Sequence, residues 1–155
     1  MTTELHPVVL RAMTWLDIDD VVAIEKDLFL DDPWTPELFW SELAQVPESR
    51  EVMVAVINNA IVGYVSLRFV GSDGDVNTIA VHSDYQGQGV GKHMIAWLEA
   101  TAITHGVTQL FLDVRSDNAP AMSMYVSRGY EQIDQRRNYY GTDVHAIVMR
   151  KRIAS

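Results

Sequence analysis

The stretch Asp84-Tyr-Gln-Gly-Gln-Gly-Val-Gly-Lys-His93 places three glycines within five positions, directly before an amphipathic segment. Glycine adopts backbone conformations and permits close approaches that a Cβ atom forbids. A glycine-rich turn that opens a helix leaves N–H groups unpaired at the positive end of the helix dipole, and such a turn binds phosphate or pyrophosphate groups. A tight turn that only caps the helix is the alternative interpretation of this stretch.

The spacing of these glycines excludes two common nucleotide-binding motifs. A P-loop requires a glycine where Gln86 stands and a serine or threonine where His93 stands. A dinucleotide-binding fingerprint requires G-x-G-x-x-G, whereas the glycines here are Gly87, Gly89 and Gly91. The stretch therefore predicts an anion-binding turn of another kind.

The length and composition of the chain are those of one globular domain. Of its 155 residues, 48% are hydrophobic and 21% are charged, and none is cysteine. The absence of cysteine excludes disulfides, thiolate zinc sites and a cysteine nucleophile. No basic segment with an apolar run begins the sequence, and no apolar stretch is long enough to cross a bilayer. We therefore expect a cytoplasmic protein.

The acidic excess lies entirely in the first third of the chain. The formal net charge is −9, and residues 1–51 contain 12 acidic and 3 basic side chains, whereas residues 52–155 contain 9 of each. A solvated acidic face and a surface that attracts a basic partner both explain this distribution. Direct binding of nucleic acid is disfavoured, because it requires a basic surface.

Hydrophobic periodicity and turn residues predict an α/β chain. Thr35 and Pro36 suit the start of a helix, Asn58-Asn59-Ala60 suits a hairpin turn, and Gly106 and Gly129 suit helix ends. The predicted order is β-α-α-β-β-β-α-β-α-β-β. Strands are expected over residues 8–13, 52–57, 61–70, 76–81, 109–115, 132–139 and 145–150, and helices over 16–29, 90–105 and 117–128 and after Thr35. The later β-α-β crossovers place the glycine-rich turn at the carboxyl end of a strand, where ligands bind in open α/β sheets.

Three stretches resemble the GNAT family of acyl-CoA-dependent N-acetyltransferases: IAVHSDYQGQGVG, LFLDVRSDNAPAMSMYVSRGY and RRNYY, within about residues 77–140. The segment Gln86-Gly-Gln-Gly89-Val-Gly91 matches the family's pyrophosphate loop, Q/R-x-x-G-x-G/A. Within this family the chain is most similar to RimI-type enzymes, which acetylate the N-terminal alanine of a small-subunit ribosomal protein. The resemblance implies one GNAT domain over residues 1–155, with a mixed, mostly antiparallel central sheet flanked by helices.

The resemblance also implies acetyl-CoA as cosubstrate. The backbone at the end of the strand before the turn would pair with the pantetheine arm as an added strand does, and the amides of residues 87–92 would hold the pyrophosphate. Asn118 would form a side-chain hydrogen bond with the cofactor arm, although a role as N-cap or first-turn asparagine explains it as well. The implied cofactor-binding residues are Ile79, Ala80, Val81, Gln86, Gly87, Gln88, Gly89, Val90, Gly91, Lys92 and Asn118.

The family's catalytic acid corresponds to Tyr125, which would protonate the leaving thiolate, with a core tyrosine as the alternative. RimI-type enzymes carry a glutamate base in L-x-L-E-V-R, where this chain reads Leu110-Phe-Leu-Asp-Val-Arg115. Asp113 is one methylene shorter, so we expect a water to relay the proton. Such a base favours an α-amine, with a pKa of about 7.7–8.0, over a lysine near 10.4. Glu25 is the competing base, and a buried structural role is the alternative for Asp113.

The resemblance assigns the acceptor side to aromatic residues. Tyr139 and Tyr140 would hold the first backbone groups of the substrate, and Trp34 and Glu25 would border the same opening, although ordinary packing explains the aromatic residues as well. His145 stands where RimI-type sequences commonly carry an acid, which puts the identity of the substrate in doubt. The other histidines show no ligand spacing, so no metal site is expected.

These features together predict an acetyl-CoA-dependent acetyltransferase acting on the α-amine of a basic protein N-terminus, such as that of a ribosomal protein. A GNAT enzyme for a small amine or an antibiotic is one alternative, and an acyl-CoA-binding module without catalysis is another. Neither a nucleic acid nor a membrane is expected as a direct partner.

Overall fold

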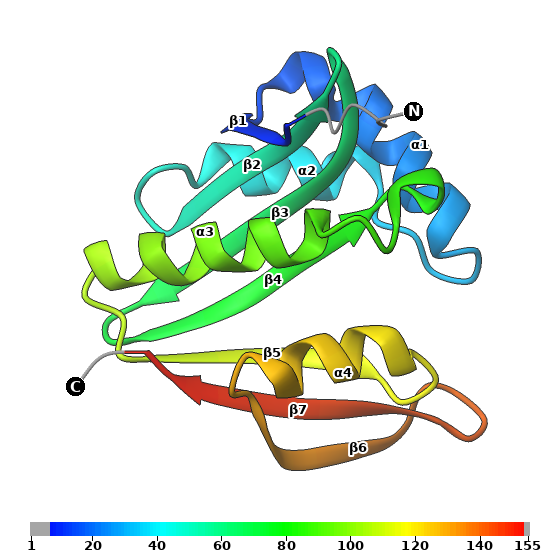
Figure 1. Cartoon of the computed structure of the whole chain (residues 1–155), viewed down its shortest axis with the longest axis vertical. Helices are drawn as coiled ribbons and strands as arrows, with labels where there is room; N and C mark the ends of the chain where they lie inside the picture. Colours follow the sequence, from blue (N-terminus) through cyan, green and yellow to red (C-terminus); the bar gives the residue numbers. More distant parts are fainter. Residues whose placement is uncertain (1–6, 154–155) are drawn as a thin grey trace, which may run out of the picture. The chain divides into compact units, whose positions relative to one another are not determined.

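A computed structural model describes residues 7–153 of the chain. The expectation about the start of the sequence rests on residues 1–6, which lie outside this range. The elements follow the predicted order (Figure 1). They are β1 Val9–Ala12, α1 Ile18–Leu28, α2 Pro36–Ala44, β2 Arg50–Ile57, β3 Ala60–Val70, β4 Asp73–Val81, α3 Val90–Thr104, β5 Gln109–Arg115, α4 Ala119–Ser127, β6 Glu131–Gly141 and β7 Val144–Arg152, with short 3-10 helices η1 Trp15–Asp17 and η2 Ser83–Tyr85.

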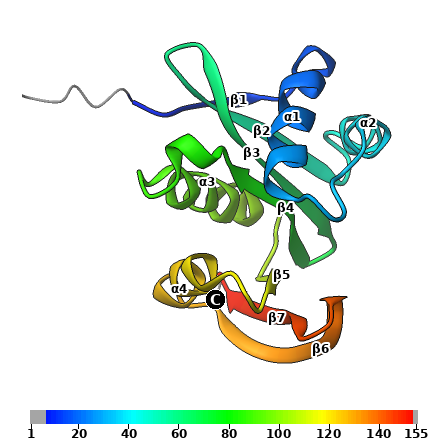
Figure 2. The same ribbon diagram turned by 90° about the vertical axis from the view of Figure 1, so that its right-hand side faces the viewer.

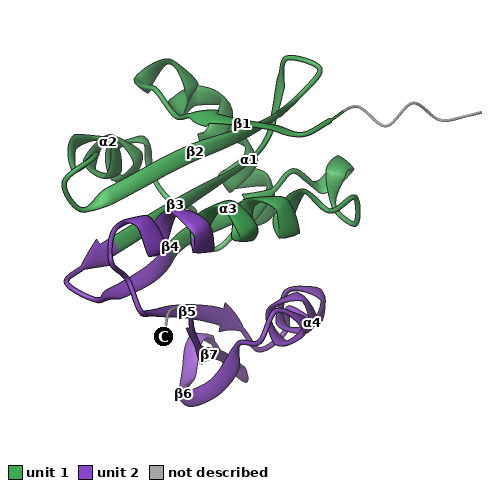
Figure 3. Ribbon diagram, turned by 60° about the vertical axis from the view of Figure 1, so that its left-hand side comes forward, with its two compact units in different colours: residues 1–68, 77–98 green, residues 69–76, 99–155 purple. Residues whose placement is uncertain are grey.

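The strands form a mixed, mostly antiparallel sheet in the order β1-β2-β3-β4-β5-β7-β6. The pairs β1–β2, β2–β3, β5–β7 and β6–β7 are antiparallel, whereas β4 and β5 pair in parallel. The predicted fold class is therefore confirmed. The chain divides into two compact units (Figure 3), which we call unit 1 (residues 1–68 and 77–98) and unit 2 (residues 69–76 and 99–155).

Unit 1 is an antiparallel meander with helices on both faces. Figure 2 shows α1 and α2 on one face of β2 and β3, and α3 on the other. Asn58 and Asn59 join β2 to β3 with φ values of 52° and 65°, as a tight hairpin turn requires. A hydrophobic cluster fills the unit, with Met13, Ile18, Val21, Val22, Ile24, Phe39, Val52, Val54, Tyr64 and Ala80 buried.

The helix expected over residues 16–29 begins instead as the 3-10 turn η1 and becomes α-helical at Ile18. The carboxylate of Asp17 explains the difference. It accepts a hydrogen bond from the Thr14 N–H (2.8 Å) and forms two with the Arg11 guanidinium (2.8 Å each). These contacts hold the first turn in a tighter conformation than the hydrophobic pattern predicts.

A buried carboxylate attaches α2 to the strands of unit 1. Glu42 accepts hydrogen bonds from Arg50 Nε (3.1 Å), Ser66 Oγ (2.5 Å) and Asn77 Nδ2 (2.7 Å), which lie on β2, β3 and β4. Removal of one partner would leave a buried charge incompletely satisfied. Glu42 therefore holds α2 against β2, β3 and β4.

Unit 2 consists mainly of β5, β7 and β6, with α4 against one face (Figure 2). Side chains of β5 alternate, so that Leu110, Leu112 and Val114 are buried whereas Asp113 is exposed. Glu99 accepts hydrogen bonds from Arg128, Tyr130 and Lys151. This second buried carboxylate connects the second half of α3 to the segment after α4 and to β7.

Candidate active site

The glycine-rich turn before α3 has backbone conformations that other residues rarely adopt. Gly87 and Gly89 have φ values of +79° and +85°, and a Cβ atom added to either would meet no atom within 4 Å. Glycine is therefore required here by conformation and not by lack of space. The His93 N–H donates to the Gly89 carbonyl (3.0 Å), so the N–H groups of residues 90–92 come before the first N–H that donates within the helix. These amides fit the pyrophosphate of a coenzyme A.

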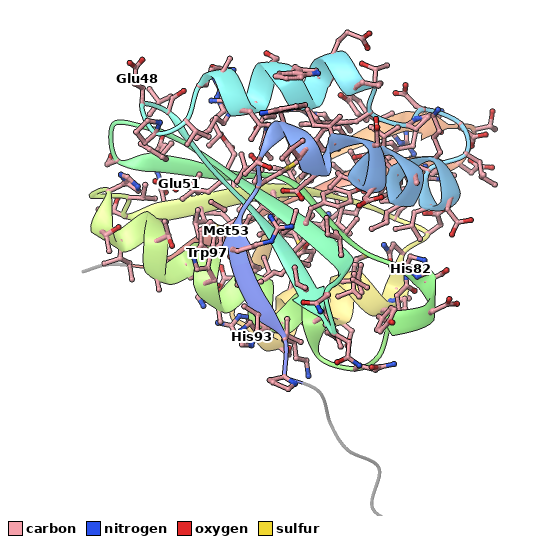
Figure 4. The ribbon with its side chains drawn as sticks, turned by 90° about the horizontal axis from the view of Figure 1, so that it is seen from above. Glu48, Glu51, Met53, His82, His93 and Trp97 are labelled. Carbon is pink, nitrogen blue, oxygen red and sulfur yellow. The ribbon has the colours of Figure 1, made fainter. Side chains whose placement is uncertain are left out.

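Side chains hold the segment that leads into this turn. Gln86 Nε2 donates to the carbonyl of Val81 (3.1 Å), at the end of β4. The Asp84 N–H donates to His82 Nδ1 (3.0 Å), and His82 lies in the loop ahead of α3 (Figure 4). These two contacts within unit 1 help to shape the turn, and they are compatible with both a helix-capping turn and an anion-binding turn.

The end of β4 offers backbone groups for an extended ligand. The parallel ladder between β4 and β5 comprises residues 73–75 and 109–111, so Ile79, Ala80 and Val81 lie beyond it. A Cβ atom at Gly63 would lie 2.8 Å from the Ala80 carbonyl oxygen, which shows how closely β3 approaches β4 at this point. An amide chain such as the pantetheine arm can pair with strand groups that a ladder does not use.

Glu25 and Trp34, both expected at the acceptor opening, are brought together in unit 1. The Glu25 side chain is buried and accepts hydrogen bonds from the Trp34 N–H (2.9 Å) and the Tyr64 hydroxyl (2.5 Å). The Trp34 ring packs against Phe39 at 5.2 Å. Burial, together with the Glu25 carboxylate, raises the pKa of Tyr64, so its hydroxyl stays protonated and donates. Glu25 thus fixes the α1–α2 loop that contains Trp34.

Asp113 and the two tyrosines expected at the acceptor side belong to one cluster of unit 2. Asp113 Oδ2 lies 3.9 Å from Arg136 Nη1, and the Asp113 side chain is 37% exposed. The Arg136 guanidinium lies 5.7 Å from the Tyr139 ring, and that of Arg115 lies 5.2 Å from the Tyr140 ring. The two tyrosine rings meet edge to face at 5.0 Å. The alternative of a buried, structural Asp113 is wrong, because this carboxylate reaches solvent.

Two tyrosines of unit 2 are held in the protonated form. Tyr125 lies on α4 with 4% of its surface exposed, and its ring meets that of Tyr130 edge on at 5.5 Å. Burial raises the pKa of Tyr125. Burial, followed by the charge of Asp113, also raises the pKa of Tyr140. Both hydroxyls are therefore neutral near pH 7 and can donate a proton or a hydrogen bond.

Asn118 is the N-cap of α4, as the alternative interpretation expected. Its Oδ1 accepts a hydrogen bond from the Ala121 N–H (3.2 Å). The cap uses only the oxygen of this amide, and the Nδ2 group is the donor that a cofactor carbonyl would need. The two interpretations of Asn118 are therefore compatible.

Sequence reasoning missed Arg115 and Arg136 as part of the Asp113 cluster. In the strand ladders, Ala146 of β7 lies opposite Arg115 of β5 and opposite Arg136 of β6. The side chains of Arg115, Ala146 and Arg136 therefore lie on the same face of the sheet in unit 2. A register shift in β6 between Gln132 and Asp134 sets this alignment. The motif RRNYY is the local signal of this site in the sequence, and it does not predict which carboxylate Arg136 faces.

Among residues 7–153, no group of three or more histidine, aspartate and glutamate side chains is arranged to hold a metal ion. In the same residues, no helix has the length and apolarity required to cross a membrane.

Residues 15–130 match the profile of the acetyltransferase (GNAT) family. N-alpha-acetyltransferase RimI of Mycobacterium tuberculosis is 35% identical to the chain, over 95% of both proteins. The crystal structure of the ribosomal-protein-S18-alanine N-acetyltransferase from Escherichia coli is similar with a TM-score of 0.86 and 28% identity, over 96% of each chain. The structure of yncA from Salmonella typhimurium, which contains acetyl-CoA, has the same fold (TM-score 0.80, 20% identity, 96% of this chain and 95% of that one). The chain therefore belongs to the GNAT family of acetyltransferases.

Membership of this family identifies the chain as an N-acetyltransferase whose acyl donor is acetyl-CoA. It confirms the predicted fold, enzyme class and cosubstrate, and the similarity to RimI-type enzymes.

Proposed function

We propose that this enzyme acetylates the α-amine of a protein N-terminus, with the N-terminal alanine of a small-subunit ribosomal protein as the first candidate. The observation that carries the proposal is the 35% identity with RimI of Mycobacterium tuberculosis over 95% of both chains. The structurally similar Escherichia coli enzyme is named for the alanine of ribosomal protein S18. A ribosomal acceptor would place the reaction in the cytoplasm.

In this proposal acetyl-CoA binds through backbone groups. The amides of residues 87–92 hold the pyrophosphate, with Lys92 adding a positive charge, and the backbone of residues 79–81 pairs with the pantetheine arm. Asn118 Nδ2 donates to a carbonyl of the same arm. Support comes from the positive φ values of Gly87 and Gly89 and from the strand residues that lie beyond the β4–β5 ladder.

Asp113 is the group that receives the proton of the amine, through a water molecule. The neutral amine attacks the thioester carbonyl carbon, the carbon–sulfur bond breaks, and the proton from nitrogen passes to the carboxylate. The exposure of Asp113 supports this role, since a half-exposed carboxylate can bind the relaying water. Both oxygens of the competing base Glu25 are occupied by donors inside unit 1, so we assign Glu25 to holding Trp34.

Tyr125 supplies the proton that neutralises the departing thiolate of coenzyme A. Its burial supports this role, because a phenol with a raised pKa stays protonated until the carbon–sulfur bond breaks. A thiol has a pKa of about 8.5, so proton transfer from Tyr125 is uphill unless the phenolate is resupplied. We therefore expect orientation of the sulfur to contribute as much as protonation.

The acceptor peptide binds through Tyr139 and Tyr140. A protonated Tyr140 hydroxyl donates to a backbone carbonyl of the peptide, as its raised pKa supports. The acidic side chains of the first 51 residues attract a basic terminus to this enzyme.

Incubation with acetyl-CoA and a peptide panel tests the proposed function. The panel varies the first residue and the basicity of the following ones, and its matched control is the same peptide with a blocked α-amine and a free lysine. Mass spectrometry should find one acetyl group, on the α-amine, with alanine preferred and the blocked peptide unmodified. Acetylation of the lysine, or of a small polyamine or aminoglycoside in preference to every peptide, would refute the proposal.

A further inference from the structure

β6 leaves its ladder with β7 at the point where the two acceptor-side tyrosines lie. Arg136 pairs with Ala146, and the next pair along the hairpin is Gly141 with Val144. Residues 137–140 of β6 therefore face a single β7 residue, His145. Bulges of this kind redirect side chains, and the backbone within them must find partners outside the regular ladder.

The imidazole of His145 supplies one of these partners. The Asn138 N–H, inside the bulge, donates to His145 Nδ1 (2.9 Å). The main chain of His145 is itself fixed to the end of β5, since its N–H donates to Ser116 Oγ (2.8 Å) and its carbonyl accepts from the Ser116 N–H (2.9 Å). His145 thus joins the bulge of β6 to the end of β5.

Asn138 needs this support because its own conformation is unfavourable. Its φ is +55°, in the left-handed region, and its Oδ1 accepts from the Asp143 N–H (2.9 Å). Tyr139 and Tyr140 follow Asn138 directly. Their rings lie beside Arg136 and Arg115, so a change in the Asn138 backbone would change both aromatic positions.

We propose that His145 is a positioning residue for the acceptor, whose neutral imidazole holds Tyr139 and Tyr140 in place and whose protonation releases them. The His145 Nδ1 carries no proton while it accepts the hydrogen bond from the Asn138 N–H. If Nδ1 were protonated, two N–H donors would face each other and the hydrogen bond would be lost. Imidazole is the side chain whose charge changes nearest to neutral pH. This inference rests on the proposed role of the two tyrosines in holding the peptide.

The charged groups next to these contacts come from both neighbouring strands. On the β5 side they are Arg115 and Asp117, which form an ion pair with each other (3.0 Å). On the β6 side they are Arg136, which faces Asp113, and Arg137, which precedes Asn138 in the bulge. Asp143, whose N–H bonds to Asn138, lies in the turn between β6 and β7. Tyr140 also lies on the β6 side, and burial raises its pKa above its ordinary value, which is already alkaline.

Two substitutions at His145 separate its hydrogen bond from its titration. His145→Asn offers an acceptor oxygen that does not titrate, and His145→Ala offers none. The acceptor amine also titrates, but it does so equally in every variant, so the ratio of parent to His145→Asn kcat/KM removes its effect. With an N-terminal peptide, this ratio should be constant above neutral pH. Below neutral pH it should fall by up to about tenfold per pH unit, as expected when one proton binds to the parent enzyme.

The change should appear in the KM of the peptide and leave the KM of acetyl-CoA within about twofold. His145→Ala should raise the peptide KM about tenfold at every pH, since one positioning contact is worth about 1.4 kcal/mol. His82→Asn is the matched comparison, because His82 Nδ1 also accepts a backbone N–H but lies before α3 (Figure 4). The ratio of the peptide KM in the parent to that in His82→Asn should not change on the acid side.

Nuclear magnetic resonance tests the contact without turnover. The Asn138 amide signal of the parent should follow the titration of the His145 ring and should not titrate in His145→Asn. If it does so while no N-terminal peptide is acetylated, the proposed function fails and the His145 contact stands. The positioning role is overturned if the Asn138 amide signal does not change as the His145 ring titrates. It is also overturned if kcat/KM of His145→Asn has the same pH dependence as that of the parent. Both results can be read whether or not His145→Ala folds.

Discussion

Replacing Gly89 by alanine should weaken acetyl-CoA binding while the chain stays folded. Gly89 has a φ of +85°, and an added Cβ would meet no atom within 4 Å, so the substitution introduces strain without a clash. An L-residue in the left-handed region costs about 1–2 kcal/mol. The free turn can avoid this strain by changing φ, which would turn the amides at the start of α3 away from the pyrophosphate. Binding must then restore the strained conformation.

The expected loss of affinity follows from this strain. Because about 1.4 kcal/mol corresponds to a tenfold change in Kd, a strain of about 1–2 kcal/mol predicts a Kd raised by about 5- to 30-fold. Isothermal titration calorimetry with acetyl-CoA measures this change directly. Circular dichroism and a thermal melt on the same preparation report whether the fold is retained.

Gly106→Ala is the matched control. Gly106 has a φ of +79° and the same free space around an added Cβ, but it follows the end of α3 instead of preceding its start. Strain that the free turn relieves does not lower the stability of the fold, so each variant should lose no more than about 2–8 °C in Tm, which is the loss that about 1–2 kcal/mol would give. Only Gly89→Ala should lose affinity. Equal binding by both variants, whether weakened or unchanged, would refute the pyrophosphate assignment.

Three further predictions concern single side chains. Tyr125→Phe should lower kcat by about 10- to 100-fold and leave the acetyl-CoA KM within a few-fold in a steady-state assay, and a parent-like rate would return Tyr125 to the core. Asp113→Ala should be slow at pH 7 and recover partly at high pH, where the amine is already neutral, whereas a pH-rescued loss in Glu25→Gln would move the base there. The hydrogen bonds from Arg11 lower the pKa of Asp17, so this pair stabilises the fold above the unfolded pKa of the carboxyl and loses its effect as pH falls through the lower folded pKa. The Tm difference between parent and Asp17→Asn should therefore disappear in acid, and a difference independent of pH would contradict the assignment.

The order of the elements could be predicted because local signals mark their ends. Asn58 and Asn59 take the positive φ values that their hairpin turn needs, Thr35 accepts the Leu38 N–H as an N-cap, and Gly106 has the positive φ that follows a helix. Each signal acts within a few residues. Element ends differ from prediction where a side chain from elsewhere intervenes, as Arg11 does at the first helical turn.

The candidate site could be predicted only in the part that a contiguous motif encodes. The glycine turn is such a part, because its conformation depends on its own residues. The ion pair of Asp113 with Arg136 and the bond of Asn138 to His145 depend on two interruptions of the β6–β7 ladder. A register change moves every following side chain to a new neighbour, and no local pattern in β6 predicts it.

The uneven charge of the chain gives an argument about the acceptor that does not depend on resemblance. In the described part of the first third, seven acidic side chains are exposed on unit 1: Asp19, Asp20, Asp27, Asp31, Asp32, Glu37 and Glu48. Asp31 and Asp32 lie in the loop that contains Trp34, and Glu48 follows α2 (Figure 4). Arg11 and Arg50 are paired with Asp17 and Glu42, so they do not offset these charges. A field of this kind mainly accelerates capture of a cation.

For a basic N-terminal peptide, kcat/KM should therefore fall as salt rises beyond about 0.15 M, where screening acts over about 8 Å. An uncharged peptide with the same first residues should be nearly indifferent to salt. Asp31→Asn with Asp32→Asn should flatten the salt dependence of the basic peptide and leave kcat unchanged. Glu131→Gln with Asp134→Asn is the matched control, because it removes the same charge from exposed positions of β6 in unit 2. If both double variants flatten the dependence equally, net charge alone explains it. The acidic surface would then be a solvated face, and only the similarity to RimI-type enzymes would support a basic ribosomal acceptor.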